Sequence, residues 1–171
     1  MCVRKIVYYP DPILRKKTTR IQDIDDEIKT LAKDMLETMY ENKGIGLAAP
    51  QIGILKKIVT VDISGPEKRE NPMVLINPEI YEKQGEVEGE EGCLSLPGFR
   101  CNVKRAEKIK VRFLDVDGKE HDISADELMS VCIQHEVDHL NGRLIIDYAG
   151  KLKRSMYEKK LKKIQRRAKR R

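Results

Sequence analysis

The sequence predicts an α+β fold in which antiparallel sheet packs against helices. Apolar residues recur at helical spacing near residues 28–40 and again near 127–140, and short β-branched runs lie between them. An Asp117-Gly118 pair separates two alternating segments, which is typical of a tight hairpin. Helical and strand-like patterns are therefore segregated along the chain instead of alternating strictly, and this favours antiparallel sheet over a doubly wound parallel one.

The first long helix is predicted from an apolar stripe. Asp25 or Asp26 can cap its start, and Gly44 can end it. Before it, Asp11-Pro12-Ile13-Leu14-Arg15 predicts a short helical turn opened by proline. The stripe consists of Ile28, Leu31, Ala32, Met35, Leu36, Met39 and Tyr40.

A second helix is predicted to begin at Ser124-Ala125-Asp126-Glu127, a pattern typical of a capping box, and to run to about Leu140. Asn141-Gly142 would end it. A basic helix is expected from Lys151. Strands are predicted over residues 57–63, 73–77, 108–116 and 119–123, with a solvated hairpin over 81–90 and a last short strand over 143–146.

The composition is that of a globular chain with a heavily charged surface. Hydrophobic residues make up 40% of the 171 residues and charged residues 36%, which suits one domain with its own core. No apolar run approaches the roughly 20 residues needed to cross a bilayer, and residues 1–10 resemble neither a secretory nor a transit peptide. We therefore expect a cytoplasmic protein without a membrane partner, whose four cysteines stay reduced.

Basic residues are concentrated at the C-terminal end. Residues 151–171 contain twelve of the 34 Lys and Arg residues and one of the 28 acidic residues, so the remaining body is mildly acidic. We expect a domain of residues 1–150 and a basic C-terminal helical extension of that domain, 151–171. The extension could face RNA phosphates, a membrane surface or only solvent.

Two of the three histidines lie in His135-Glu136-Val137-Asp138-His139. In a helix they share one face, where two imidazoles can bind one metal ion and Glu136 can reach a water on that ion. The same face carries Leu128 and Val131, so the ion would sit in a low-dielectric pocket. The alternative is a chance match, but buried imidazoles without a metal would need other hydrogen-bond partners.

A catalytic metal site usually has three protein ligands and one open position. Candidates for the third ligand are Cys93, Cys101, Cys132 and the downstream acidic residues. Cys132 precedes His135 by three residues and is expected to line the pocket wall. Cys93 lies between Gly92 and Pro97-Gly98, where backbone can approach a ligand closely. Taken alone, Cys93 is more simply an inert buried thiol.

The segment Gly44-Ile45-Gly46-Leu47-Ala48-Ala49-Pro50-Gln51 has little side-chain bulk. An extended peptide could lie against it like an added strand, and the Gln51 amide could stabilise a developing oxyanion. A helix end followed by a plain loop is the alternative.

Three segments together resemble the signature motifs of the peptide deformylase family, in the family's order. They are Gly44 to Gln51, Glu91-Gly92-Cys93-Leu94-Ser95, and Gln134-His135-Glu136-Val137-Asp138-His139-Leu140. The resemblance spans roughly residues 1–150, which would form the catalytic metallohydrolase domain. It implies antiparallel sheets packed around a central metal-binding helix, with an N-terminal amphipathic helix and a basic C-terminal helix.

The resemblance also implies an activity, namely removal of the N-formyl group from the N-terminal formylmethionine of nascent proteins, with release of formate. Cys93, His135 and His139 would hold the metal, which is Fe²⁺ in the cell, with Zn²⁺, Ni²⁺ or Co²⁺ able to substitute. Glu136 would move the proton. Gln51 and the Leu94 backbone N–H would stabilise the oxyanion.

The family's substrate contacts fall on further positions of this chain. The substrate backbone would be bound by Ile45, Gly46 and Gly92, and the methionine pocket would be lined by Val131 and Cys132. Arg100 would support the cysteine loop or the substrate, although a plain surface arginine explains it equally well. Asp138 is expected to orient a metal ligand.

Two other functions stay open. The first is a His-Glu-x-x-His zinc metallopeptidase, with Glu158, nineteen residues beyond His139, as third ligand. The second is a ribosome- or nucleic-acid-binding module with a structural metal, which would require four protein ligands. Bacterial members of the resembled family use a basic C-terminal helix at the ribosome. Removing residues 151–171 is therefore expected to weaken ribosome binding and to leave peptide turnover nearly intact.

Overall fold

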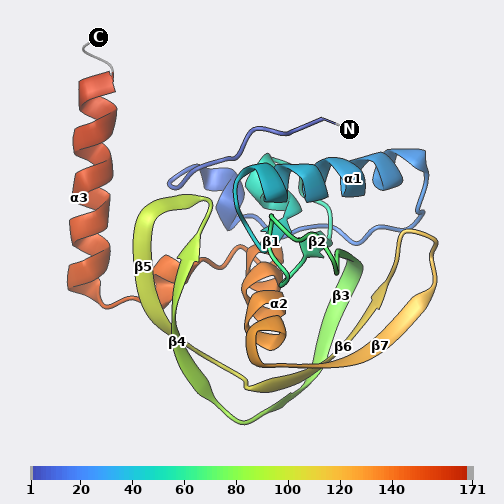
Figure 1. The fold of residues 1–171 in the computed structure, drawn as a ribbon. Coiled ribbons are helices and arrows are strands. Elements are labelled where there is room, and N and C mark those ends of the chain that lie inside the picture. The colour runs from blue at the N-terminus through green and yellow to red at the C-terminus, as the bar shows by residue number, and fades with distance from the viewer. Residues whose placement is uncertain (1, 169–171) are drawn as a thin grey trace.

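The computed structural model describes residues 2–168. In it, strands surround a central helix on several sides (Figure 1). The elements in chain order are η1 (Pro12–Arg15), α1 (Asp26–Glu41), β1 (Gly46–Ala48), η2 (Ala49–Ile52), β2 (Ile58–Val61), β3 (Met73–Gln84), β4 (Val87–Cys93), β5 (Leu96–Arg105), β6 (Lys108–Leu114), β7 (Glu120–Asp126), α2 (Glu127–Leu140), η3 (Ile145–Tyr148) and α3 (Lys151–Ala168).

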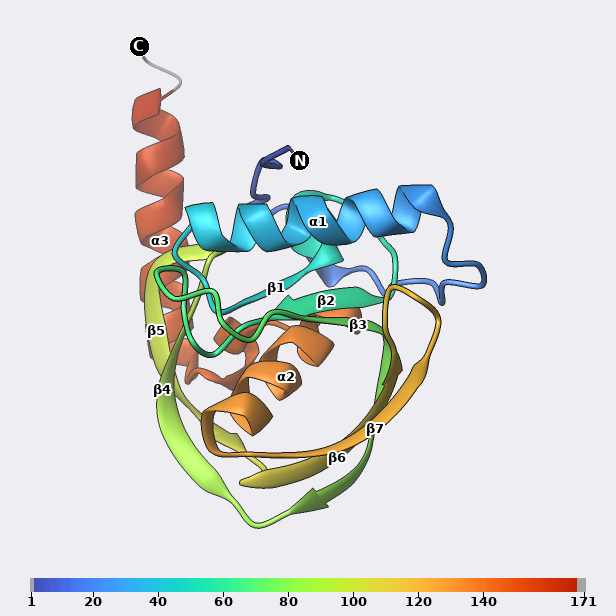
Figure 2. The same ribbon diagram turned by 45° about the vertical axis from the view of Figure 1, so that its right-hand side comes forward.

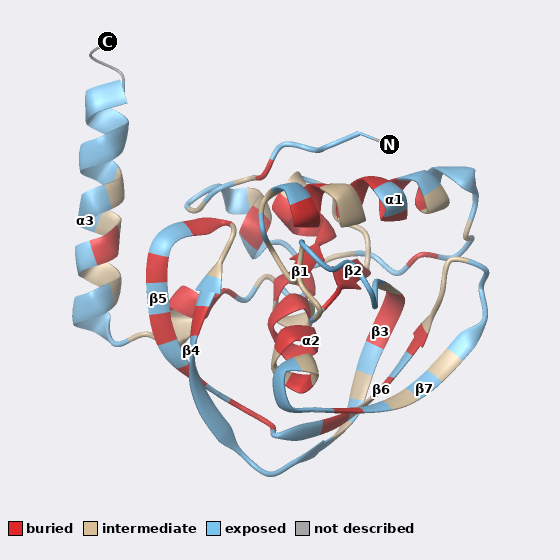
Figure 3. Cartoon of the chain, in the orientation of Figure 1, coloured by how far each residue is buried: buried red, intermediate tan, exposed pale blue. Residues whose placement is uncertain are grey.

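The strands form two antiparallel sheets, as the segregated pattern predicts. The larger sheet has the order β1-β2-β3-β6-β7, and β4 and β5 form a separate pair. Figure 2 shows α2 lying between them, with β4 and β5 on one side and β3, β6 and β7 on the other. Because α2 is covered on several sides, most of its residues are buried (Figure 3).

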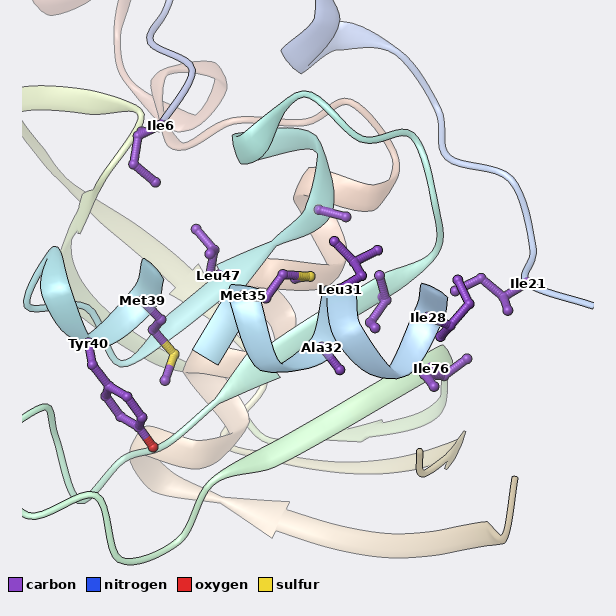
Figure 4. Packing of buried hydrophobic residues seen from close by; sticks show 12 residues of the cluster. Ile6, Ile21, Ile28, Leu31, Ala32, Met35, Met39, Tyr40, Leu47 and Ile76 are labelled. Atoms are coloured by element: carbon purple, nitrogen blue, oxygen red, sulfur yellow. The ribbon is translucent and has the colours of Figure 1, made fainter. Parts of the chain in front are cut away.

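The first helix forms where its apolar stripe predicts it. Asp25 caps α1 by accepting a hydrogen bond from the backbone N–H of Ile28. The stripe packs on β1 and the adjoining strands, so that Met35 and Met39 are fully buried (Figure 4). This packing fixes the chain that leaves α1 and enters β1, which is the low-bulk segment identified above.

Three local predictions are wrong. Ser124 does not cap α2, because it lies in β7, where it pairs with Lys110 of β6, and β7 continues to Asp126 before the helix begins. The segment 81–90 is not a hairpin, since β3 pairs with β6 and β4 pairs with β5. Residues 143–146 do not form a strand but lead into the 3₁₀ turn η3. In the first two cases strand pairing overrides the local preference, whereas the turn η3 is held by local hydrogen bonds between Leu144 and Asp147.

The basic helix α3 projects from the body but is anchored near its start (Figure 1). Tyr157 is buried, packs on Phe99 with ring centroids 4.9 Å apart, and donates a hydrogen bond to the Pro97 carbonyl over 3.0 Å. Tyr9 joins this cluster from the N-terminal segment. Tyr157 therefore anchors the first half of α3 to the packed core, and removal of residues 151–171 is expected to cost stability, contrary to the expectation from sequence that the extension is dispensable.

Candidate metal centre

Cys93, His135 and His139 meet at one point between β4 and α2. One donor atom from each lies within 4.8 Å of the other two. The Cys93 sulfur is 3.3 Å from Nε2 of His139. Cys93 ends β4 just before the tight turn into β5, whereas the two histidines occupy one face of α2. Their ring centroids are 5.1 Å apart.

The chemistry of this donor set fits a divalent transition metal. One thiolate and two imidazoles are donors that Fe²⁺ and Zn²⁺ bind well. Nδ1 of His135 is hydrogen-bonded to Glu91 over 2.9 Å, which leaves its Nε2 for an ion. Among the described residues, two buried side-chain atoms lack a hydrogen-bond partner, namely Nδ1 of His139 in the cluster and Oε2 of Glu136, the residue that follows His135. Three protein donors leave a fourth position open.

Glu136 lies next to the cluster. It follows His135 directly in α2 and is buried. Burial raises the pKa of this carboxyl to about 7, because the opposing effects of His135 and Arg105 do not outweigh the loss of solvation. Gly46 leaves the space that Glu136 occupies, since a Cβ at position 46 would stand 2.5 Å from Glu136 Oε1.

Gln51 is held beside the cysteine rather than in a free loop. Its Oε1 accepts a hydrogen bond from the Ala48 N–H over 2.9 Å, which fixes the orientation of the amide. Its Nε2 then points toward Ser95 Oγ at 3.3 Å and Cys93 Sγ at 3.6 Å. Leu94 follows Cys93 in the turn between β4 and β5.

A cavity of about 610 Å³ opens onto the cluster. All six residues predicted to contact substrate line it, namely Ile45, Gly46, Gly92, Arg100, Val131 and Cys132. They come from the entry to β1, the β4–β5 pair and α2. Arg100 is exposed and forms an ion pair with Glu90 at the rim.

Two buried residues beside the metal cluster were missed by sequence reasoning. Glu91 accepts from His135 and also from Arg105, whose side chain is 4% exposed. Burial alone would raise the pKa of Glu91, but the hydrogen bonds from Arg105 and His135 outweigh it and lower that pKa to about 2. Glu91 stands inside a recognised motif and could have been found, whereas Arg105 has no local pattern that marks it.

Within residues 2–168, the Asp138 carboxylate has no hydrogen bond to Cys93, His135 or His139. Its carboxylate accepts hydrogen bonds from Arg105 and Tyr148. Glu158, the rival third ligand, is also elsewhere. It lies on α3, where it accepts hydrogen bonds from Tyr9 and Arg154, and it is not part of the cluster. Cys101 is buried and donates to the Ile145 carbonyl.

An α+β fold with a three-donor metal cluster, a buried carboxylate beside it and an open cavity defines a metal-dependent hydrolase of the His-Glu-x-x-His type. The polypeptide deformylase family model matches residues 3–155. The chain belongs to the polypeptide deformylase family. It is therefore a metal-dependent amide hydrolase that removes the N-formyl group from nascent peptides.

Individual relatives are similar to this chain over nearly its whole length. The peptide deformylase of Nitrosococcus oceani is 50% identical over 97% of this chain and 98% of its own length. That of Alkalilimnicola ehrlichii is 48% identical over 96% and 92%. The crystal structure of a peptide deformylase from Legionella pneumophila, 44% identical, covers 99% of both chains with a TM-score of 0.91. No helix within residues 2–168 is long and apolar enough to cross a bilayer.

Proposed function

We propose that Cys93, His135 and His139 hold a single divalent ion, Fe²⁺ in the cell, and that Glu136 is the general base and acid of deformylation. The observation that supports this most directly is the convergence of one thiol and two imidazoles beside a buried carboxylate. Zn²⁺, Ni²⁺ and Co²⁺ are acceptable substitutes, because the donor set suits each of them.

When bound, the ion lowers the pKa of a water molecule and polarises the formyl carbonyl. Glu136 takes a proton from the attacking water and later gives a proton to the leaving amine, so that formamide and water become formate and a free amino terminus. A raised carboxyl pKa suits a group that must hold a proton between these two steps. Gln51 Nε2 and the Leu94 N–H donate to the developing oxyanion.

The cavity accommodates the formylmethionine itself. Ile45, Gly46 and Gly92 offer backbone hydrogen bonds to an extended peptide. Val131 and Cys132 line an apolar wall that suits an unbranched thioether side chain. Arg100 stands at the cavity rim, where it contacts the peptide beyond its first residue. Each of these residues lines the same cavity as Cys93.

Release of formate from formyl-Met-Ala-Ser tests this function. We expect turnover by the metal-loaded protein and none with acetyl-Met-Ala-Ser. Glu136→Gln should lower kcat by about 10² to 10⁴-fold while the metal stays bound. Cleavage of an internal peptide bond without formate release would favour the peptidase, and full activity of the Gln variant would remove Glu136 from the mechanism.

We also propose that the basic helix α3 docks on ribosomal RNA, so that the enzyme meets nascent chains in the cytoplasm. Lysine and arginine residues cover the exposed faces of α3, and only one acidic residue, Glu158, interrupts them. Neutralising phosphates with such residues releases counterions, which makes the association sensitive to salt.

A further inference from the structure

The proposed metal ligands come from two elements whose separation must be held constant. Cys93 ends β4, and His135 lies in α2. Glu91 precedes Cys93 by two residues on β4 and is hydrogen-bonded to His135 Nδ1. This contact therefore links the strand that carries the sulfur donor to the helix that carries the nitrogen donors (Figure 2).

The link continues through Arg105 on β5 and returns to α2. Nε and Nη2 of Arg105 donate to the two carboxylate oxygens of Glu91, each over 2.9 Å. Nη1 donates to Asp138 Oδ2 over 2.6 Å. Asp138 lies three residues after His135 on the same helix. His135, Glu91, Arg105 and Asp138 thus form a closed ring that fastens the β4–β5 pair to α2.

Tyr148 on η3 contacts two members of this ring, Asp138 and Arg105. Its hydroxyl donates to the same Asp138 Oδ2 over 2.6 Å, and the Arg105 guanidinium carbon lies 5.0 Å from its ring centroid. Burial and the hydrogen bond to Asp138 raise the pKa of Tyr148 to about 12, so the hydroxyl remains a donor at neutral pH. Asp138 cannot turn away from Arg105 without losing both donors.

We propose that Asp138 and Tyr148 are positioning residues, which hold Arg105 and Glu91 in place and thereby fix the orientation of His135 toward the metal. The inference rests on the proposed ligand set. Arg105 and Glu91 are both buried, so loosening one partner leaves a charge without full compensation in a low-dielectric site. A displacement of Arg105 or Glu91 therefore also displaces His135, because solvent cannot compensate the buried charges.

The test compares Asp138→Asn and Tyr148→Phe with the wild type, using Co²⁺ as the probe. Co²⁺ affinity is measured by competition with a chelator, and the electronic absorption spectrum of the Co²⁺-loaded protein reports the ligand geometry. Because changing the groups that orient a metal ligand typically costs 10- to 100-fold in affinity, we expect a loss in that range for Asp138→Asn. For Tyr148→Phe we expect a loss near its lower end, and an altered spectrum for both.

The chain offers a matched control outside the proposed metal site and its cavity. Tyr81 donates to Asp122 over 2.6 Å, and the Arg112 guanidinium carbon lies 5.0 Å from its ring. Tyr81→Phe and Asp122→Asn therefore remove the same kind of hydrogen bond from the same kind of triad on the exposed β3–β6–β7 surface. We expect both controls to keep wild-type Co²⁺ affinity and spectrum.

Thermal unfolding of the metal-free variants separates positioning from support of the fold. If Asp138→Asn and Tyr148→Phe lower only the unfolding temperature, and Co²⁺ affinity and spectrum stay within about twofold of wild type, the inference is overturned. Formate release by the wild type tests the proposed function separately, because Co²⁺ affinity and spectrum are measured without substrate.

Discussion

The sulfur of Cys93 lies 3.3 Å from Nε2 of His139, although 46 positions separate the two residues in the chain. This contact distinguishes the site from that of a metallopeptidase with an acidic third ligand. Glu158, the residue at the matching distance in sequence, lies outside this cluster and accepts a hydrogen bond from the Tyr9 hydroxyl.

Replacing Cys93 should therefore remove the metal, whereas replacing Glu158 should not. For Cys93→Ala we expect at least a hundredfold loss of metal affinity, because one of three protein donors is lost. Glu158→Ala and the exposed Cys2→Ala should retain the metal through dialysis against a weak chelator, as measured by metal analysis. Loss of metal in Glu158→Ala with retention in Cys93→Ala would refute the proposed ligand set.

Gly46→Ala should impair catalysis without unfolding the protein. The added Cβ would stand 2.5 Å from Glu136 Oε1 and 2.9 Å from Cys132 Sγ, so the carboxylate must move. Since a displacement of about 1 Å at a reacting group can cost about a hundredfold in rate, we expect kcat to fall by about 10- to 100-fold. Gly89→Ala on β4 is the control, because a Cβ there meets nothing within 4 Å. Equal rates for the two variants would show that Glu136 tolerates the displacement.

Two truncations should distinguish the structural role of the first half of α3 from the role of the basic residues in its second half. Removing residues 151–171 deletes the buried Tyr157, and we expect the free energy of unfolding to fall by on the order of 3 kcal/mol. Removing only residues 162–171 keeps Tyr157 and takes away seven basic residues.

The shorter truncation should retain turnover of formyl-Met-Ala-Ser and lose salt-sensitive co-sedimentation with ribosomes. Undiminished co-sedimentation at physiological salt would exclude α3 as the ribosome contact. Denaturant unfolding of both truncated proteins checks the stability difference.

Asp34 should contribute stability at neutral pH that is lost in acid. Burial would raise the pKa of Asp34, but hydrogen bonds from the Cys2 N–H over 2.7 Å and from Arg4 lower it overall. A folded-state pKa below the unfolded value means that the contribution is complete above the unfolded pKa and declines as pH falls through the folded one.

We therefore expect Asp34→Asn to cost about 1–3 kcal/mol between pH 5 and 8. The difference from wild type should shrink below about pH 4, the pKa range of an unfolded aspartate. Urea unfolding at a series of pH values measures both effects. A difference that stays constant down to pH 2 would show that the charge of Asp34 is irrelevant to its role.

Activity in air should depend on which metal is loaded. Fe²⁺ and a thiolate ligand such as Cys93 both oxidise, so we expect the Fe²⁺ form to lose activity on exposure to oxygen and the Ni²⁺ form to persist. Anaerobic samples of each form serve as controls. Equal decay of the two forms in air would contradict iron as the source of the lability.

The spacing of residues along the chain was sufficient to predict the two long helices, two of the three proposed metal donors and the family. Helical periodicity located α1 and α2, and the four-residue interval of His135 and His139 placed two donors on one helix face. The three motifs together indicated the family. Those features could be predicted because each depends on residues that are near neighbours in the chain.

Spacing alone left the third donor open among Cys93, Cys101, Cys132 and the downstream acidic residues, and it gave no indication of Arg105. The tertiary structure brings Cys93 to the two histidines and Arg105 to Glu91. Neither contact follows from local spacing, because the approach of β4 to α2 depends on strand register and on how the sheets wrap the helix. Buried charges such as Arg105 and Glu91 are stable only when such distant partners meet, and no local pattern records which partners those will be.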